Sequence, residues 1–166
     1  MKTPEQRLKT RIRVLLIFFI TGLVLSGVTA FPIESELELI ATNSPTNALQ
    51  QWINTVYHAV VVTNANYPFI AYGTDWLAFA HIVIAIAFIG PLRDPVRNIW
   101  VLQFGMIACV LIIPLAFIAG PIRQIPIGWS LLDCCFGVVG IIPLYLCYCY
   151  TKKLELIKTN PILTSN

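Results

Sequence analysis

The chain has 166 residues, of which 57% are hydrophobic and only 11% are charged, and its formal net charge is +3. Its mean hydropathy is +0.77. A soluble domain carries about 25% charged residues, so this composition excludes an ordinary soluble domain, a nucleic-acid-binding protein and a disulfide-stapled secreted module. We therefore expect an all-α integral membrane protein whose principal partner is the lipid bilayer.

Four apolar segments are long enough to cross a bilayer. A spanning helix needs about 20 apolar residues, because the hydrocarbon core is about 30 Å thick and a helix rises about 1.5 Å per residue. Prolines stand in the short connections after the second and third segments, which predicts hairpins there. We expect a polytopic protein with an antiparallel up-down bundle in a single membrane domain, residues 1–166, and a cytoplasmic tail over 151–166. The predicted spans are residues 14–30, 69–90, 99–119 and 131–150.

The long connection, residues 31–68, has a helical pattern of its own. Ser44 offers an N-cap and Pro45 the first helical position of a helix over about 45–62, which carries opposed apolar and polar stripes. The same spacing predicts a shorter helix over 33–41. We expect the longer element to be an amphipathic extracytoplasmic helix between spans one and two that lies flat, either on the outer leaflet or as a cap over the outer end of the bundle.

Ten of the eleven basic residues fall on one side of the predicted bundle, and only Arg123 falls on the other. Because basic loops are retained on the cytoplasmic side, both termini are predicted to be cytoplasmic. A cleaved signal peptide ending near Ala30 is the alternative for span one, and it leaves the orientation of the other spans unchanged. The ten residues are Lys2, Arg7, Lys9, Arg11, Arg13, Arg93, Arg97, Lys152, Lys153 and Lys158.

Ionisable and amphipathic side chains gather, by predicted depth, toward the outer half of the bundle. A charge inside a span costs about 2.5–3.5 kcal/mol on insertion scales, which makes such residues candidates for function. Their convergence is typical of a small-molecule or lipid-headgroup pocket that opens to the outer leaflet. The alternative is that the two aspartates are interfacial, with Asp133 capping a helix or paired with Arg123. The predicted ligand-binding residues are His58, Asp75, Trp76, His81, Arg123, Trp129 and Asp133.

His81 lies about a dozen residues inside span two, with Ala78 and Ala85 at helical spacing on either side. These alanines leave a shallow groove that a flat group or another helix can approach. One interpretation is a functional histidine, either a haem b ligand, a proton relay or a hydrogen-bonding partner of a quinone. The other is a neutral histidine that donates to a facing carbonyl or to Gln103. A bis-histidine haem would require His58, the second histidine of the chain.

Small residues predict where the helices pack. The five cysteines all lie in predicted spans without CxxC or metal-ligand spacing, so we expect packing roles for them and no metal site. Pro114 and Pro143 are expected to kink spans three and four. Close helix approach is predicted at Gly22, Ser26, Gly105, Cys109, Gly137 and Gly140.

Several runs of the chain carry a resemblance. Residues 72–81, from Tyr-Gly-Thr-Asp-Trp to Ala-His, and residues 90–98, Gly-Pro-Leu-Arg-Asp-Pro-Val-Arg-Asn, resemble a family of small four-span bacterial inner-membrane proteins with no known activity. Residues 26–32 and 120–134 fit the same resemblance, which covers nearly the whole chain. It implies a bacterial plasma membrane and carries over no functional residue.

Three functions are compatible with these features. The favoured one is a non-catalytic integral membrane protein, either an accessory subunit of a larger or homo-oligomeric assembly or a binder of a lipid-like or hydrophobic ligand in the outer-leaflet pocket. The second is a haem- or quinone-linked redox subunit that uses His81. The third is a small oligomeric transporter or channel, suggested by Asp75 and the proline kinks, although four spans without an internal repeat are few for a carrier.

Overall fold

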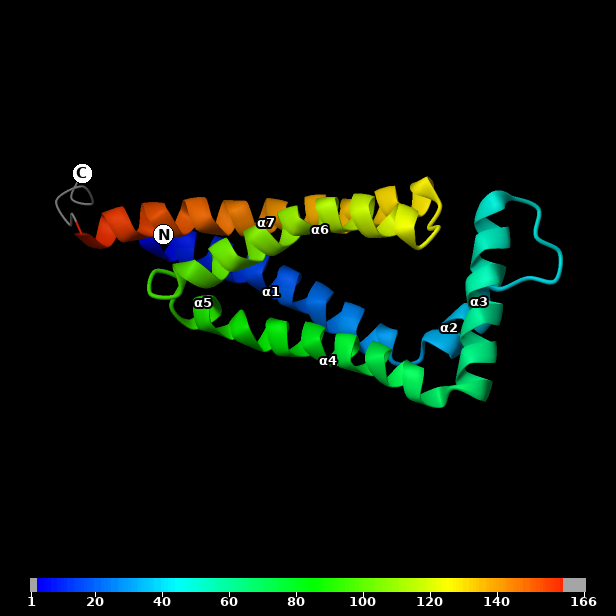
Figure 1. Ribbon diagram of the computed structural model, residues 1–166. Coiled ribbons are helices and arrows are strands. Elements are labelled where there is room, and N and C mark those ends of the chain that lie inside the picture. Colours follow the sequence, from blue (N-terminus) through cyan, green and yellow to red (C-terminus); the bar gives the residue numbers. More distant parts are fainter. Residues whose placement is uncertain (1–2, 160–166) are drawn as a thin grey trace. The chain divides into compact units, whose positions relative to one another are not determined.

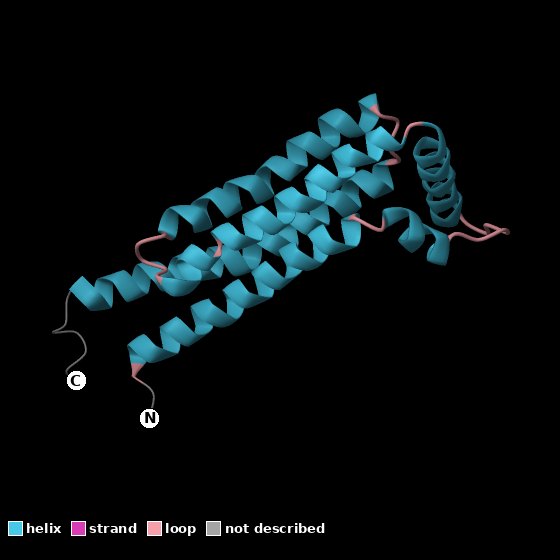
Figure 2. Ribbon diagram, turned by 90° about the horizontal axis from the view of Figure 1, so that it is seen from below, coloured by secondary structure: helices cyan, strands magenta, loops and turns pink. Residues whose placement is uncertain are grey.

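The computed structural model describes residues 3–159, and within them it contains helices and turns but no strand. Four helical segments of this part are long and apolar enough to cross a membrane, as Pro4–Ala30, Pro68–Arg93, Ile99–Ile122 and Ile127–Thr159. The prediction of an all-α chain with four candidate spans is thereby confirmed (Figures 1 and 2). The elements are α1 (Pro4–Ala30), α2 (Ile33–Ile40), α3 (Ala48–Asn66), η1 (Pro68–Ile70), α4 (Ala71–Ala87), α5 (Ile89–Arg93), α6 (Ile99–Ile122) and α7 (Ile127–Thr159).

The first and last helices extend beyond their apolar runs because polar contacts continue them. Thr3 and Gln6 form a reciprocal capping box ahead of α1, with Thr3 Oγ1 accepting from Gln6 N at 3.2 Å and Gln6 Oε1 accepting from Thr3 N at 3.1 Å. In α7, Lys152 Nζ lies 3.0 Å from Glu155 Oε2. The predicted tail therefore continues α7 as far as Thr159, and residues 160–166 lie outside the described part.

Both helices predicted between spans one and two are present as α2 and α3. The N-cap of α3 is Asn47, whose side chain accepts from Gln50 N at 2.9 Å, so the predicted cap at Ser44 lies three residues too early. Asn54 fixes the intervening turn, because its Nδ2 donates to Thr42 O at 2.6 Å and its Oδ1 accepts from Thr42 N at 3.0 Å.

The chain forms two compact units, unit 1 (Met1–Thr21 and Ile86–Asn166) and unit 2 (Gly22–Ala85). In unit 1, α6 and α7 lie side by side as an antiparallel hairpin, and the described ends of α1 and α7 meet at the end opposite the α6–α7 turn (Figures 1 and 2). The interior of the unit is apolar. Its fully or almost fully buried side chains include Ile12, Leu16, Phe88, Leu102, Leu144 and Leu154.

Small residues bring α6 and α7 into backbone contact, as predicted for Gly105, Cys109 and Gly137. A Cβ added at Gly137 would lie 2.6 Å from the carbonyl oxygen of Cys109. A Cβ at Gly105 would lie 2.7 Å from Phe88 Cζ and 2.9 Å from Leu144 Cδ1. Membrane helices associate through such close packing because lipid offers no hydrophobic driving force between them.

The α6–α7 turn has the hydrogen bonds of a Schellman motif. Ile125 N donates to Gly120 O at 2.9 Å, and Gln124 N donates to Pro121 O at 3.2 Å. Gln124 occupies the left-handed position of this motif with a φ of 58°, which usually selects glycine.

The first half of α1 packs on α7 within unit 1. Cys147 is buried there, and its Sγ lies 3.7 Å from the carbonyl oxygen of Ile12. The Arg11 guanidinium lies over the ring of Tyr150, with 5.8 Å between its Cζ and the ring centroid. These contacts attach the basic N-terminal turns of α1 to α7.

In unit 2, the second half of α1 crosses α4 at Gly27. A Cβ there would lie 2.8 Å from the carbonyl oxygen of Ala78 and 3.2 Å from His81 Cβ. The prediction that Gly22 mediates close approach was wrong, because a Cβ at that position would meet nothing within 4 Å. The hydrogen bond from Asn64 Nδ2 to Glu34 Oε2, 2.5 Å long, joins α3 to α2 in the same unit.

Candidate functional site

The predicted ligand-binding residues divide between the two units, so the outer-leaflet pocket that combines them stays a prediction. Unit 2 contains His58, Asp75, Trp76 and His81, and unit 1 contains Arg123, Trp129 and Asp133.

Trp76 belongs to an exposed aromatic stripe along α4. Its ring makes edge contacts with Tyr72 at 5.9 Å and Phe79 at 5.8 Å between centroids, and all three side chains are exposed. The neighbouring Asp75 is half-buried, and no basic group of residues 3–159 lies within 4.0 Å of its carboxylate. The stripe has the composition of the aromatic belts that membrane helices present to the headgroup region.

His81 has a local partner. Its Nδ1 lies 2.8 Å from the carbonyl oxygen of Leu77, so the predicted bond to a carbonyl is present, but the acceptor lies one turn back in α4 and not on a facing helix. Ala78 and Ala85 are buried, and α1 packs against the groove beside His81 through Gly27. The groove was predicted to accept either a flat group or another helix. In the structure, the helix α1 lies against it.

His58 lies on α3 and is exposed. Its ring packs beside that of Tyr57, with 5.7 Å between the centroids. The two histidines therefore belong to different helices of unit 2, and each has its own local contact.

In unit 1, Asp133 and Arg123 do not pair. Ion pairs among residues 3–159 are confined to Glu5 with Lys9 and Lys152 with Glu155. The predicted capping role of Asp133 is also wrong, because α7 begins at Ile127 and the half-buried Asp133 lies in its second turn. Trp129 lies one turn earlier, and its backbone N donates to Pro126 O at 2.8 Å.

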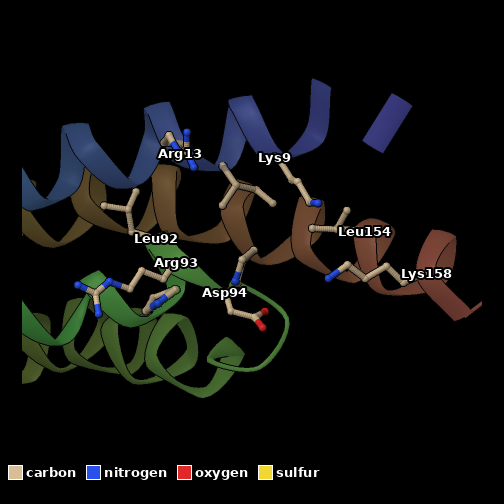
Figure 3. A pocket seen from close by; sticks show the side chains of 10 residues that line it. Lys9, Arg13, Leu92, Arg93, Asp94, Leu154 and Lys158 are labelled. Atoms are coloured by element: carbon tan, nitrogen blue, oxygen red, sulfur yellow. The ribbon is translucent and has the colours of Figure 1, made fainter. Parts of the chain in front are cut away.

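A cavity of about 160 Å³ lies in unit 1, at the end where the described ends of α1 and α7 meet. Its lining comes from α1, from α5 with the turn that follows, and from α7 (Figure 3). The apolar side of the lining includes Ile12 and Leu154, which are 2% and 0% exposed. The charged side consists of Lys9, Arg13, Arg93 and Lys158 with a single carboxylate, Asp94.

The charges of this basic cavity are only partly compensated. Lys9 Nζ lies 2.6 Å from Glu5 Oε1. Arg13, Arg93 and Lys158 have no carboxylate within 4.0 Å among residues 3–159. Three full positive charges therefore border the same hollow without an ion-pair partner, which creates a local positive potential.

The turn between α5 and α6 is held by its own side chains. Asp94 Oδ1 accepts from Arg97 N at 3.1 Å. Asn98 Nδ2 donates to Asp94 O at 2.9 Å and to Gly90 O at 3.2 Å. These bonds fix the backbone directly after Arg93, which is the last residue of α5. Sequence reasoning used these basic residues only to orient the chain, because their meeting point depends on tertiary packing.

The cysteines form no bridge among the described residues. Cys109 and Cys147 are buried, Cys134 and Cys149 are half-buried, and Cys135 is exposed. Within residues 3–159, His, Cys, Asp and Glu do not gather in any group of three that could hold a metal ion. Of the buried pair, Cys109 lies where α6 approaches Gly137 of α7, and Cys147 Sγ donates to Ile12 O at 3.7 Å.

Comparison with known proteins gave no match: no protein-family model, no curated protein sequence and no solved structure is significantly similar to the chain. The resemblance to small four-span bacterial inner-membrane proteins accordingly stays a prediction.

Proposed function

We propose that the chain is a multi-pass protein of the bacterial inner membrane, with both termini and the α5–α6 turn in the cytoplasm and residues 31–68 outside. The support is the one-sided distribution of lysine and arginine, since positively charged segments are retained on the cytoplasmic side. One cavity of unit 1 is lined by basic residues from three segments that are distant in sequence, in keeping with a common side for these segments. The residues are Lys9 and Arg13, Arg93, and Lys158.

Its function in this proposal is non-catalytic binding of a lipid-like ligand. The observation that carries the proposal is the basic cavity, which combines an apolar lining with a cationic one. An amphiphile with an apolar chain and an anionic head matches that combination, and basic pockets between membrane helices are typical sites for anionic headgroups. In this proposal the ligand binds on the cytoplasmic side, whereas the sequence predicts a pocket that opens to the outer leaflet. An accessory-subunit role is compatible with the same chemistry.

Native mass spectrometry of the full chain, purified in a mild detergent, tests lipid binding. The chain is first stripped of co-purified lipid and then exposed to a mixture of membrane lipids. The proposal predicts a one-to-one lipid adduct that survives collisional removal of the micelle. A spectrum with the bare chain alone, at lipid concentrations that saturate ordinary lipid-binding proteins, contradicts it.

A redox role is the second candidate, and the His81 geometry favours it. When Nδ1 carries the proton and donates to Leu77 O, Nε2 is left as an acceptor for a quinone or as a ligand for haem iron. This role predicts a Soret band, or a co-purified quinone, that is lost in His81→Ala and kept in His58→Ala. Purified chain with neither signal after growth with haem precursors rejects the redox role.

A further inference from the structure

We infer that the basic cavity between α1, α5 and α7 is a binding site for a phosphate group, with Arg13, Arg93 and Lys158 as its ligands. The phosphate belongs either to an anionic lipid or to a free anion of the cytoplasm. The inference deepens the proposed lipid-binding function, and it rests on that function for the choice of a lipid as the source.

The charge balance favours an anion. Arg13, Arg93 and Lys158 are exposed, so water weakens their mutual repulsion, but three like charges around one hollow still create a positive potential there. Glu5 forms an ion pair with Lys9, whereas Arg13, Arg93 and Lys158 have no carboxylate within 4.0 Å in the described part of the chain. Asp94, the one acidic residue of the lining, already uses Oδ1 as a cap for the backbone of Arg97. A bound phosphate supplies the missing negative charge.

The donor chemistry favours phosphate. Two of the three uncompensated groups are guanidinium groups, which present paired N–H donors that match the spacing of phosphate oxygens. Arg13 comes from α1, Arg93 from α5 and Lys158 from α7, so the cations of the lining come from three elements (Figure 3). The cavity volume of about 160 Å³ is many times the roughly 10–15 Å³ needed for one water.

The position of the cavity favours a lipid as the source. Arg13 directly precedes Val14, where the apolar run of α1 begins, and Arg93 is the last residue of a candidate span. Both therefore lie at the level where a bilayer has its phosphates. Leu92 and Pro95 are half-buried residues of the lining, and they supply apolar surface beside the charged groups, suited to the glycerol region of a lipid.

The test measures binding of phosphatidylglycerol, diacylglycerol and inorganic phosphate to the full chain in mild detergent. The informative variant is the double substitution Arg13→Gln with Arg93→Gln. Its matched control is Arg7→Gln with Lys153→Gln, which removes the same charge from exposed positions of α1 and α7 outside the cavity lining. Helix content and thermal midpoint are recorded for both variants, so that binding is compared between folded chains.

We expect phosphatidylglycerol to bind at least about tenfold more weakly to the Arg13/Arg93 variant, since two charge-assisted bonds are lost, and less than about twofold more weakly to the control. The Arg13→Lys with Arg93→Lys variant keeps the charge but loses the paired donors, and we expect an intermediate affinity. Equal losses in the cavity variant and the control, or no loss in either, overturn the inference.

Comparison of the three ligands distinguishes the phosphate site from the proposed lipid-binding function. Phosphatidylglycerol binding that millimolar inorganic phosphate does not displace identifies the lipid phosphate as the ligand. Inorganic phosphate that binds alone and depends on Arg13 and Arg93, without lipid binding, supports the phosphate site and contradicts the lipid function. Diacylglycerol that binds as tightly as phosphatidylglycerol, in every variant, supports a lipid function and overturns the phosphate site. Failure of all three ligands contradicts both.

Discussion

Replacing Gly137 by alanine should open the α6–α7 hairpin. The added Cβ would lie 2.6 Å from the carbonyl oxygen of Cys109, and ordinary contact begins at 3.4 Å, so the two helices must separate by about 0.8 Å. The opposing atom belongs to the backbone of α6, which cannot rotate away as a side chain does. Nearby contacts of the hairpin, including that between Gly140 and Cys109 Sγ, must loosen with it.

The loss of stability caused by Gly137→Ala is best measured against a second glycine-to-alanine substitution in a helix. Overpacking a tight contact costs about 1–3 kcal/mol. Alanine is also more favourable than glycine inside a helix by about 1 kcal/mol, and this gain partly offsets the loss from overpacking. Gly22→Ala is the matched control, because Gly22 is also inside a helix and its added Cβ meets nothing within 4 Å. We expect Gly137→Ala to be less stable than Gly22→Ala by about 1–3 kcal/mol.

Unfolding by sodium dodecyl sulfate from mild detergent micelles, followed by circular dichroism, measures this difference. The reactivity of the buried Cys109 toward a small maleimide should rise in Gly137→Ala and stay unchanged in Gly22→Ala. Equal stability of the two variants, with unchanged Cys109 reactivity, refutes the close approach of α6 and α7.

Two further substitutions test local structure. Gln124→Gly should stabilise the chain by about 1 kcal/mol in the same titration, because Gln124 holds a φ of 58° that costs a residue with a side chain more than it costs glycine; a loss of stability contradicts the left-handed turn. Asn54→Ala should cost about 1–2 kcal/mol locally and speed amide hydrogen exchange at Thr42, because both bonds between Asn54 and Thr42 are lost. The exposed Gln51→Ala should leave that exchange unchanged, and equal effects of these two substitutions argue against the reciprocal pair.

The existence and order of the spans could be predicted from the sequence because each apolar run is long enough to decide the matter alone. The ends of the helices could not be predicted from hydropathy. Thr3 and Gln6 begin α1 well before the apolar run through a capping box, and the Lys152–Glu155 pair lies in the continuation of α7 beyond it. At α3, Asn47 caps the helix in place of Ser44 because its side chain reaches the backbone of Gln50.

Contacts between helices were predicted less well, because sequence gives depth along a helix more readily than direction around it. Gly22 and Gly27 are both small residues of α1, and only Gly27 faces α4. His81 illustrates the same point, since its depth was clear but its partner, Leu77 O, depends on the rotamer. Arg13, Arg93 and Lys158 are assigned to one side of the membrane by sequence, whereas their meeting around one cavity is a property of tertiary packing.

The central proposal, four spans with the α5–α6 turn in the cytoplasm, is tested most directly by cysteine accessibility in intact cells. With the five native cysteines replaced by alanine, Ser44→Cys marks the α2–α3 turn and Val96→Cys marks the α5–α6 turn. The account predicts that a membrane-impermeant maleimide labels Ser44→Cys in intact cells and Val96→Cys only after the membrane is opened. Labelling of Val96→Cys in intact cells, or of both positions from the same side, contradicts it.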